Sequence, residues 1–354
     1  MKRKLPTPKT TQRGMGLVEI MVALVIGLVA SLVIFQTLRD SGRRATTTTS
    51  GGDALTSGAL ALHYLERDIR QAGWGFTTQD EEAATNLNGA VNCNFGGNWT
   101  TPDGTSAAQP LMPLAIRGGA LAQNQLLVTY GTSGLYTGAG QFTRTSATKL
   151  ATQNYYGFAD GNRVLLVSEP GGVCELAIAA IDSATPGSLG VTSTTIAKGT
   201  IYNLGPRGGS IDDAPQRIEW SVVGTSLQRR RMPAHTDAAW VSNWQNSTFD
   251  NQAEIIADGV LEMQVRYRVR GGACQLNPPA SPRDIEGVCV GLLVRSKHYS
   301  EIEVTTNAPS WVGGAFAATN GGACADSPNC WENYRYEVFE KIIPMRNMIW
   351  GSRS

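Results

Sequence analysis

The longest apolar run of the chain extends from Met15 to Phe35 and contains a single charged residue, Glu19. A helix of these 21 residues would be about 31 Å long at 1.5 Å per residue, which matches the ~30 Å hydrocarbon core of a bilayer. The run therefore predicts a membrane-spanning helix over residues 15–35.

Apolar residues at spacings of three and four continue beyond this run. They predict an amphipathic helix that ends at Gly73, where a positive φ is favourable. The expected apolar stripe consists of Ala54, Leu55, Ala59, Leu62, Leu65 and Ile69, with Glu66, Arg67 and Asp68 mainly off it. Residues 46–53, TTTTSGGD, have low helix propensity. Two interpretations follow: one long helix over 15–73 with a weak middle, in which Asp53 caps the second half, or two helices joined by a loop.

Beyond residue 74 the pattern changes to short apolar or alternating segments. The predicted strands cover 126–130, 164–167, 217–223, 226–232, 261–270 and 336–343. The predicted Gly-, Ser- and Thr-rich loops cover 85–110, 131–162 and 306–330. Strict alternation over 261–270 indicates a half-buried strand with one polar face. We therefore expect an α+β fold: a long N-terminal helix packed on a loop-rich antiparallel β-sheet domain, 74–354, with one or two subdomains.

Basic residues are concentrated at the N-terminus. Residues 1–14 contain five of them and no acidic residue, so the rest of the chain carries a formal charge of −4 although the whole chain carries +1. Such a basic leader is typical of a targeting segment. It outweighs the three arginines that follow the apolar run, Arg39, Arg43 and Arg44, and so predicts a cytoplasmic N-terminus. The near-neutral total argues against a nucleic-acid partner.

The apolar run differs from a cleaved secretory signal. It is longer than the usual 7–15 residues, and no A-x-A-like site follows it. Glu19 is also unusual, because a carboxylate inside a membrane costs roughly 2.5–3.5 kcal/mol. Either Glu19 lies near the interface, or it pairs with a cation at the same depth. A new α-amino group, created by cleavage before Met15, would supply that cation.

Residues 13–24, RGMGLVEIMVAL, resemble the type III signal of type IV pilins and of type II secretion pseudopilins. The resemblance implies that Gly14 is the last leader residue and that Met15 becomes the N-methylated mature N-terminus. It also implies that Glu19 pairs with the N-terminal amine of a neighbouring subunit. The sequence departs from the family at Met15, where phenylalanine is usual. It also has Gln36 where major pilins tend to have a helix-kinking proline.

Three further stretches resemble PilW-type minor pilins: residues 65–75 (LERDIRQAGWG), 260–267 (VLEMQVRY) and 344–347 (PMRN). This resemblance implies an inner-membrane precursor with a periplasmic domain in a Gram-negative bacterium. The mature protein would prime pilus assembly in a minor-pilin tip complex, with roles in adhesion and twitching motility. The implied partners are prepilin peptidase, other minor pilins and the major pilin, the inner-membrane platform protein, a tip adhesin, and membrane lipid before assembly.

Two alternatives to the minor pilin stay open. One is a pseudopilin of type II secretion, which shares the signal. The other is a membrane-anchored periplasmic enzyme or binding protein with an uncleaved anchor, against which Glu19 argues.

The six cysteines are Cys93, Cys174, Cys274, Cys289, Cys324 and Cys330. Their even number and the predicted export indicate disulfides. Proximity in sequence favours Cys274–Cys289 and Cys324–Cys330, which leaves Cys93–Cys174, among 15 connectivities in all. The spacing does not match a zinc site, so we expect no metal.

The sequence contains no recognisable catalytic constellation. Its histidines, His63, His235 and His298, are scattered, and neither a nucleophile elbow nor a Walker A motif is present. The basic triplet Arg229–Arg231 is interpreted mainly as a solvated strand face; anionic lipid, DNA or another subunit are its alternative partners. We therefore predict a protein that is not an enzyme and has no cofactor.

Overall fold

The computed structural model describes residues 16–75, 93–100, 106–111, 113–118, 124–134, 140–152, 156–169, 173–181, 187–206, 215–232, 253–272, 274–279, 284–300, 303–317 and 331–347. Side chains are not described for residues 43–50, 93–100 and 106–111. The chain divides into two compact units, residues 1–51 and 52–354, and each is considered by itself.

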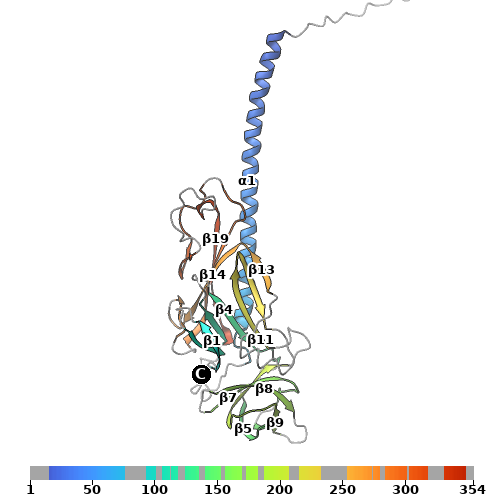
Figure 1. Cartoon of the computed structure of the whole chain (residues 1–354), viewed down its shortest axis with the longest axis vertical. Helices are drawn as coiled ribbons and strands as arrows, with labels where there is room; N and C mark the ends of the chain where they lie inside the picture. The colour runs from blue at the N-terminus through green and yellow to red at the C-terminus, as the bar shows by residue number, and fades with distance from the viewer. Residues whose placement is uncertain are drawn as a thin grey trace, which may run out of the picture. The chain divides into compact units, whose positions relative to one another are not determined.

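One continuous helix, α1, extends from Leu17 to Gln71 over 55 residues (Figure 1). This favours the single-helix interpretation over two helices joined by a loop. The expected cap at Asp53 is wrong, because this residue lies inside the helix and its flanking backbone is helical. The helix ends as predicted before Gly73, which has a φ of 82° and donates its backbone N–H to Thr129 O at 2.9 Å.

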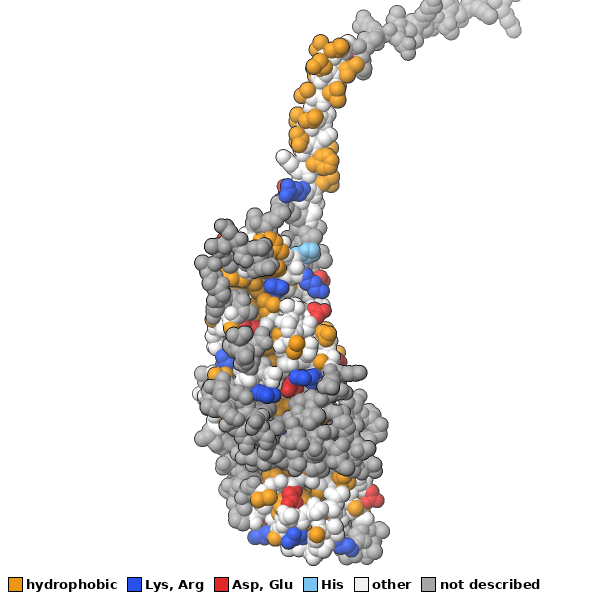
Figure 2. Space-filling view, viewed as in Figure 1, with side chains coloured by type: hydrophobic (Ala, Val, Ile, Leu, Met, Phe, Trp, Pro, Cys, Tyr) orange, Lys and Arg blue, Asp and Glu red, His pale blue; other side chains and the backbone are white. Residues whose placement is uncertain are grey.

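In the first unit, the apolar part of α1 extends from Leu17 to Gly42 and is long and apolar enough to cross a membrane. All of its described side chains are exposed, and hydrophobic side chains follow it along its length (Figure 2). A helix that is apolar all round needs lipid or other helices to cover it. The candidate span Leu17–Gly42 covers residues 17–35 of the predicted span, 15–35, and continues into more polar residues that include Arg39 and Asp40.

In the second unit, one face of α1 is buried in the domain core. The buried positions recur at spacings of three and four: Ala54, Gly58, Ala61, Leu65, Asp68 and Ala72, together with Ile69. The predicted stripe is wrong at Leu55, which is 50% exposed, and at Ala59. The buried face is rotated from the expected one because Gly58, Ala61 and Asp68 take part in it.

Two antiparallel sheets form the core with this helix. The first contains, in order, β13 (Glu254–Asp258), β12 (Ser226–Arg231), β11 (Gln216–Val223), β4 (Gln125–Tyr130) and β3 (Leu114–Arg117). The second contains β15 (Cys274–Gln275), β14 (Val260–Val269), β16 (Ile285–Arg295) and β19 (Tyr336–Pro344). The backbone N–H of Ile116 in β3 donates to the hydroxyl of Tyr267 in β14 at 2.8 Å, which links the two sheets. The α+β fold expected from the sequence is confirmed.

A closed six-stranded barrel is inserted between β4 and β11, which are neighbours in the first sheet (Figure 1). Its strands are β5 (Gly140–Ser146), β6 (Lys149–Thr152), β7 (Arg163–Ser168), β8 (Cys174–Ile181), β9 (Ser188–Val191) and β10 (Lys198–Gly205). They close in the order β10-β5-β6-β9-β8-β7 around a separate apolar core that includes Phe142, Leu150 and Ile201. The predicted loop 131–162 is therefore wrong, since β5 and β6 lie within it.

The other two predicted loops also contain strands. Strands β1 (Cys93–Thr100) and β2 (Ser106–Leu111) pair with each other, as do β17 (Ser310–Trp311) and β18 (Gly314–Ala315). A 3-10 turn, η4, covers Trp331–Asn333. The β17–β18 pair covers one face of β14, where Trp311 Nε1 donates to Gln264 Oε1 at 2.9 Å. The face of β14 predicted to be solvated is thus buried at Glu262 and Gln264.

Candidate functional site

The first candidate site is the membrane-length part of α1. Glu19 lies in its first turns, exposed among exposed apolar side chains that include Val18 and Leu24. Residues 19, 23, 27 and 31 follow each other at spacings of four and share one helix face. On this face the hydroxyl of Ser31 donates a hydrogen bond to the backbone oxygen of Gly27 at 2.8 Å. The carboxylate is thus placed on an uncovered apolar surface.

The other residues predicted for processing, Gly14 and Met15, lie outside the described residues. Cleavage and N-methylation at these positions stay predictions.

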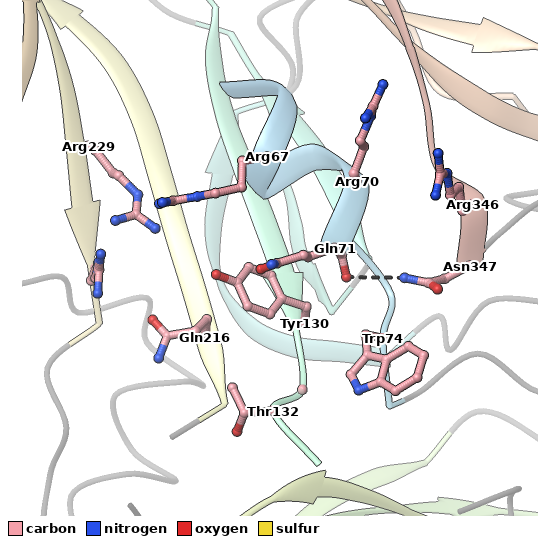
Figure 3. A pocket seen from close by; sticks show the side chains of 12 residues that line it. Arg67, Arg70, Gln71, Trp74, Tyr130, Thr132, Gln216, Arg229, Arg346 and Asn347 are labelled. Atoms are coloured by element: carbon pink, nitrogen blue, oxygen red, sulfur yellow. Dashed lines mark hydrogen bonds between the residues drawn. The ribbon is translucent and has the colours of Figure 1, made fainter. Parts of the chain in front are cut away.

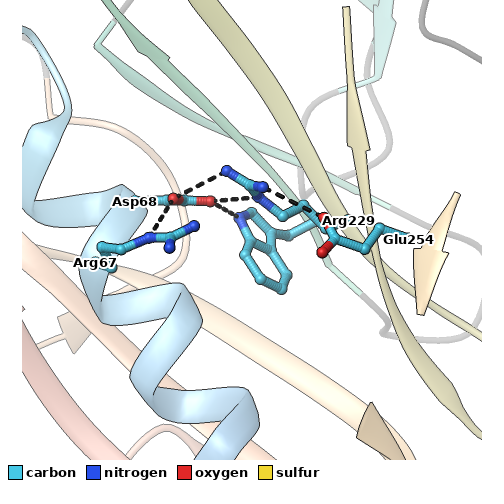
Figure 4. A network of polar contacts seen from close by, with 5 residues as sticks. Arg67, Asp68, Arg229 and Glu254 are labelled. Atoms are coloured by element: carbon cyan, nitrogen blue, oxygen red, sulfur yellow. Dashed lines mark hydrogen bonds and ion pairs between the residues drawn. The ribbon is translucent and has the colours of Figure 1, made fainter. Parts of the chain in front are cut away.

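The second candidate site is a buried polar network in the domain core (Figure 4). Asp68 of α1 is completely buried, and two nitrogen atoms of Arg229 in β12 contact its carboxylate. Arg229 Nε lies 2.8 Å from Oδ2, and Nη2 lies 3.2 Å from Oδ1. The Trp220 indole in β11 donates to the same Oδ2 at 3.2 Å. One carboxylate on the helix is thereby held by two adjacent strands.

Two further charges complete this network. Arg229 Nη1 lies 3.3 Å from Glu254 Oε2, and Arg67 Nε lies 3.5 Å from Asp68 Oδ1. Burial alone would lower the pKa of Arg229, but the charge of Asp68 and the hydrogen bonds to Asp68 and Glu254 outweigh burial and raise this pKa. Because breaking a buried ion pair leaves an uncompensated charge, the pair fixes where α1 can lie on the sheet.

The sequence interpretation missed this network. Asp68 was expected off the apolar stripe, and Arg229 was expected on a solvated face; both are buried. A signal was nevertheless present. Asp68 follows Leu65 by three residues and precedes Ala72 by four, so it occupies a stripe position. Arg229 follows the buried Leu227 by two residues in the same strand, and so shares its inward face.

The rest of the basic triplet is less buried. Arg230 is 34% exposed and forms an ion pair with Glu219 of β11. Arg229 and Arg230 of the triplet therefore form ion pairs within the domain.

The structure contains a disulfide between Cys274 of β15 and Cys289 of β16, whose Cα atoms are 6.0 Å apart. This is the pairing that proximity favoured. Cys174 at the start of β8 is also disulfide-bonded. The side chain of Cys93, and Cys324 and Cys330, lie outside the described residues, so the other two pairings stay predictions.

The histidines do not form a site among the described residues. His63 is exposed on α1 next to Tyr64, and His298 is exposed after β16, while His235 lies outside the described part. Within the described ranges, no group of three His, Cys, Asp or Glu side chains could hold a metal ion.

Comparison with known proteins identifies one segment of the chain. Residues 9–35 match the prokaryotic N-terminal methylation motif. No curated protein and no solved structure matches the chain. The matched residues include the whole predicted cleavage region and most of the exposed apolar part of α1. The chain thus begins with a type IV pilin-like prepilin signal, and this motif supports a type IV pilin-like or pseudopilin-like precursor.

Proposed function

We propose that this protein is a minor pilin of a type IV pilus, cleaved after Gly14 by prepilin peptidase and methylated at Met15. The observation that carries the proposal is the methylation motif over residues 9–35, which continues into an apolar helix with uncovered side chains. In this proposal residues 1–14 are the leader, 15–73 the helix, and 74–354 the periplasmic domain.

The assembly mechanism follows from the apolar helix. Before assembly, lipid covers its side chains and keeps the subunit in the inner membrane, with the N-terminus in the cytoplasm. After extraction, helices of other subunits cover the same surface. Glu19 then neutralises the α-amino group of a neighbouring subunit, because an unpaired charge in an apolar environment is costly. This pairing sets the axial register of adjacent subunits.

The preference for a PilW-type minor pilin is supported by how the three resembling stretches pack. Residues 65–75 comprise the end of α1 and the turn that follows it, and 260–267 belong to β14; both contribute to the same core as Met345. Asn347 Nδ2 donates to Gln71 O at 3.3 Å and to Ala72 O at 3.0 Å, and so caps the C-terminal end of α1. The three stretches are thus parts of one structural unit, in which the C-terminal end of α1 packs on the domain. We propose that this unit positions the domain in a tip complex that primes pilus assembly.

A pseudopilin of type II secretion is the second candidate, because its precursor carries the same signal. The two differ in the machine that assembles them: a minor pilin is recovered with sheared pili, with the major pilin and the other minor pilins, whereas a pseudopilin is required for protein secretion.

The N-terminus of the mature protein tests the proposal. Mass spectrometry of membranes from cells with and without prepilin peptidase should detect a chain that begins at methylated Met15 only when the peptidase is present. A chain that keeps Met1 under both conditions, or one cleaved beyond Phe35, would contradict it.

Replacement of Glu19 tests the assembly role separately. Glu19→Gln should leave the protein in the membrane fraction but remove it from sheared pili, because the amide cannot neutralise an ammonium group. Ser31→Ala, on the same helix face, serves as the control and should leave incorporation unchanged. Equal incorporation of Glu19→Gln and the wild type would refute the role of this carboxylate.

A further inference from the structure

A cavity of about 770 Å³ lies at the C-terminal end of α1, between the helix, the first sheet and the residues that follow β19 (Figure 3). Five arginines and two aromatic residues on its wall define what is called here the arginine cavity: Arg67, Arg70, Trp74, Tyr130, Arg229, Arg231 and Arg346. Its volume is within the range of about 300–1,000 Å³ that is usual for small-molecule sites.

Positive charge exceeds negative charge around this cavity. No carboxylate lines it within the described part of the chain. The wall carries Arg67, Arg70, Arg229, Arg231 and Arg346. The described carboxylates that form ion pairs with Arg67, Arg70 and Arg229 are Glu66, Asp68 and Glu254, and none of the three lines the cavity.

Contacts within the domain explain why some of these arginines lie at the cavity, but they do not explain all of them. Arg67 and Arg70 lie in the last turns of α1, where cations are favourable beside the helix C-terminus. Arg229 is held by Asp68. Arg346, in contrast, follows β19 and forms no ion pair with a described residue. The carbonyl groups at the end of α1 are already bonded by its neighbour Asn347. An exposed arginine thus lines a cavity that four other arginines also line.

Trp74 and Tyr130 add an aromatic surface to the arginine cavity. Trp74 is 36% exposed, and its ring is fixed by the hydrogen bond from Nε1 to Ser133 O at 2.9 Å. In Figure 3, Tyr130 lies between Trp74 on one side and Arg67 and Arg229 on the other. Burial raises the pKa of Tyr130 to about 12, so its hydroxyl stays neutral and can donate a hydrogen bond at physiological pH. A fixed indole face beside guanidinium groups suits a ligand that combines a ring with an oxyanion.

We propose that the arginine cavity binds a small phosphate monoester that carries a planar ring, of the nucleoside monophosphate class. The phosphate would be held by Arg70 and Arg346, whose side chains lie on the same wall of the cavity, and the ring would lie on Trp74 (Figure 3). A phosphate monoester carries about −1.5 to −2 charges at pH 7, which suits a wall that has five arginines and no carboxylate among its described residues. This inference does not depend on the proposed pilin function.

Calorimetric titration of the full chain in detergent at low salt tests the proposal. The probes are adenosine 5′-monophosphate, adenosine, inorganic phosphate and glucuronate. The monophosphate should bind most tightly, and its affinity should fall as salt is added, because the contact is between charges. Tighter binding of glucuronate would overturn the phosphate assignment, and binding of adenosine as tightly as the monophosphate would overturn the role of the arginines.

Three variants locate the binding site. Arg346→Gln should weaken monophosphate binding at least tenfold without changing the unfolding temperature, because this side chain is exposed. Trp74→Leu should weaken binding of the monophosphate but not that of inorganic phosphate. The matched control is Arg270→Gln, which removes an exposed arginine that pairs with Glu286 and does not line the cavity. No binding to the wild type, or wild-type affinity in Arg346→Gln, would refute the proposal.

Discussion

Arg229 Nε lies 2.8 Å from Asp68 Oδ2, and these side chains expose 2% and 0% of their surfaces. Removal of one member leaves the other charge buried without its main partner. Asp68→Ala should therefore lower the free energy of unfolding of the domain by about 3–5 kcal/mol. Denaturant unfolding of the full chain in detergent, followed by tryptophan fluorescence, measures this change.

A double replacement serves as the control for this ion pair. Asp68→Leu combined with Arg229→Met removes both charges and keeps apolar volume in the core. Such replacements are often neutral or stabilising, so the double variant should be clearly more stable than Asp68→Ala. If Asp68→Ala alone unfolds like the wild type, the pair does not hold the helix on the sheet.

Gly58 of α1 lies directly against the ring of Phe339 in β19, and a Cβ atom at position 58 would overlap that ring. Alanine is favoured over glycine inside a helix by about 1 kcal/mol, whereas overpacking of a core costs about 1–3 kcal/mol. Because Phe339 is only partly buried and its ring can shift, we expect Gly58→Ala to lower the free energy of unfolding by about 1 kcal/mol.

Gly52 provides a matched control on the same helix, since a Cβ atom there would meet nothing within 4 Å. Gly52→Ala should stabilise the helix slightly. In a Phe339→Ala background, Gly58→Ala should also become neutral or stabilising, because the ring is gone. A destabilising effect that persists in this background would show that the ring is not the cause.

Glu66 of α1 accepts a hydrogen bond from Lys341 Nζ at 2.8 Å. This bond, together with the charges of Lys341 and Arg70, outweighs burial and lowers the pKa of Glu66 from its usual 4.5. The resulting stability is present above the unfolded-state pKa and is lost as the pH falls through the lower folded-state pKa. Lys341→Gln should therefore lower the free energy of unfolding by about 0.5–1 kcal/mol at pH 7, and the difference should vanish once Glu66 is protonated.

Unfolding curves at pH 7 and at about pH 2 would measure this dependence. Lys297→Gln, at an exposed position outside these ion pairs, should have no pH-dependent effect. A difference between Lys341→Gln and the wild type that is the same at both pH values would rule out Glu66 as its origin.

The disulfide between Cys274 and Cys289 closes a loop with a sequence separation of 15 residues. In the chain-entropy model, a loop of about 15 residues contributes about 3 kcal/mol by restricting the unfolded chain. The double variant Cys274→Ala, Cys289→Ala should lower the free energy of unfolding by about 2–4 kcal/mol. Mass spectrometry under non-reducing conditions would verify that the other disulfides are retained, and an unchanged unfolding midpoint would contradict the expected contribution.

Hydrophobic periodicity predicted the elements whose buried face is regular. The helix up to Gly73, the strands predicted at 217–223 and 226–232, and the strand after Val260 all lie where the sequence placed them. The barrel could not be predicted in this way, because β5 and β6 are short and each contains a single large apolar residue. Their inward positions, such as Phe142 and Leu150, are too few to form a visible alternation.

The polar core was missed for a different reason. Charged residues are expected at the surface unless their partners are known, and the partners of Asp68 come from residues 152 and 161 positions away in sequence. Only the tertiary structure brings these residues together. The prepilin signal was recognisable because the predicted cleavage site, Glu19 and the apolar run are adjacent in sequence.

The barrel leaves the first sheet after β4 and returns to it at β11, where Tyr130 and Gln216 are directly paired. An ordinary hairpin turn would therefore close the same two strands. The anchoring of α1 involves Asp68, Trp220 and Arg229, none of which belongs to the barrel. The contacts of Asp68 with the first sheet thus do not require the inserted module, so the barrel can be exchanged, enlarged or lost while these contacts are kept.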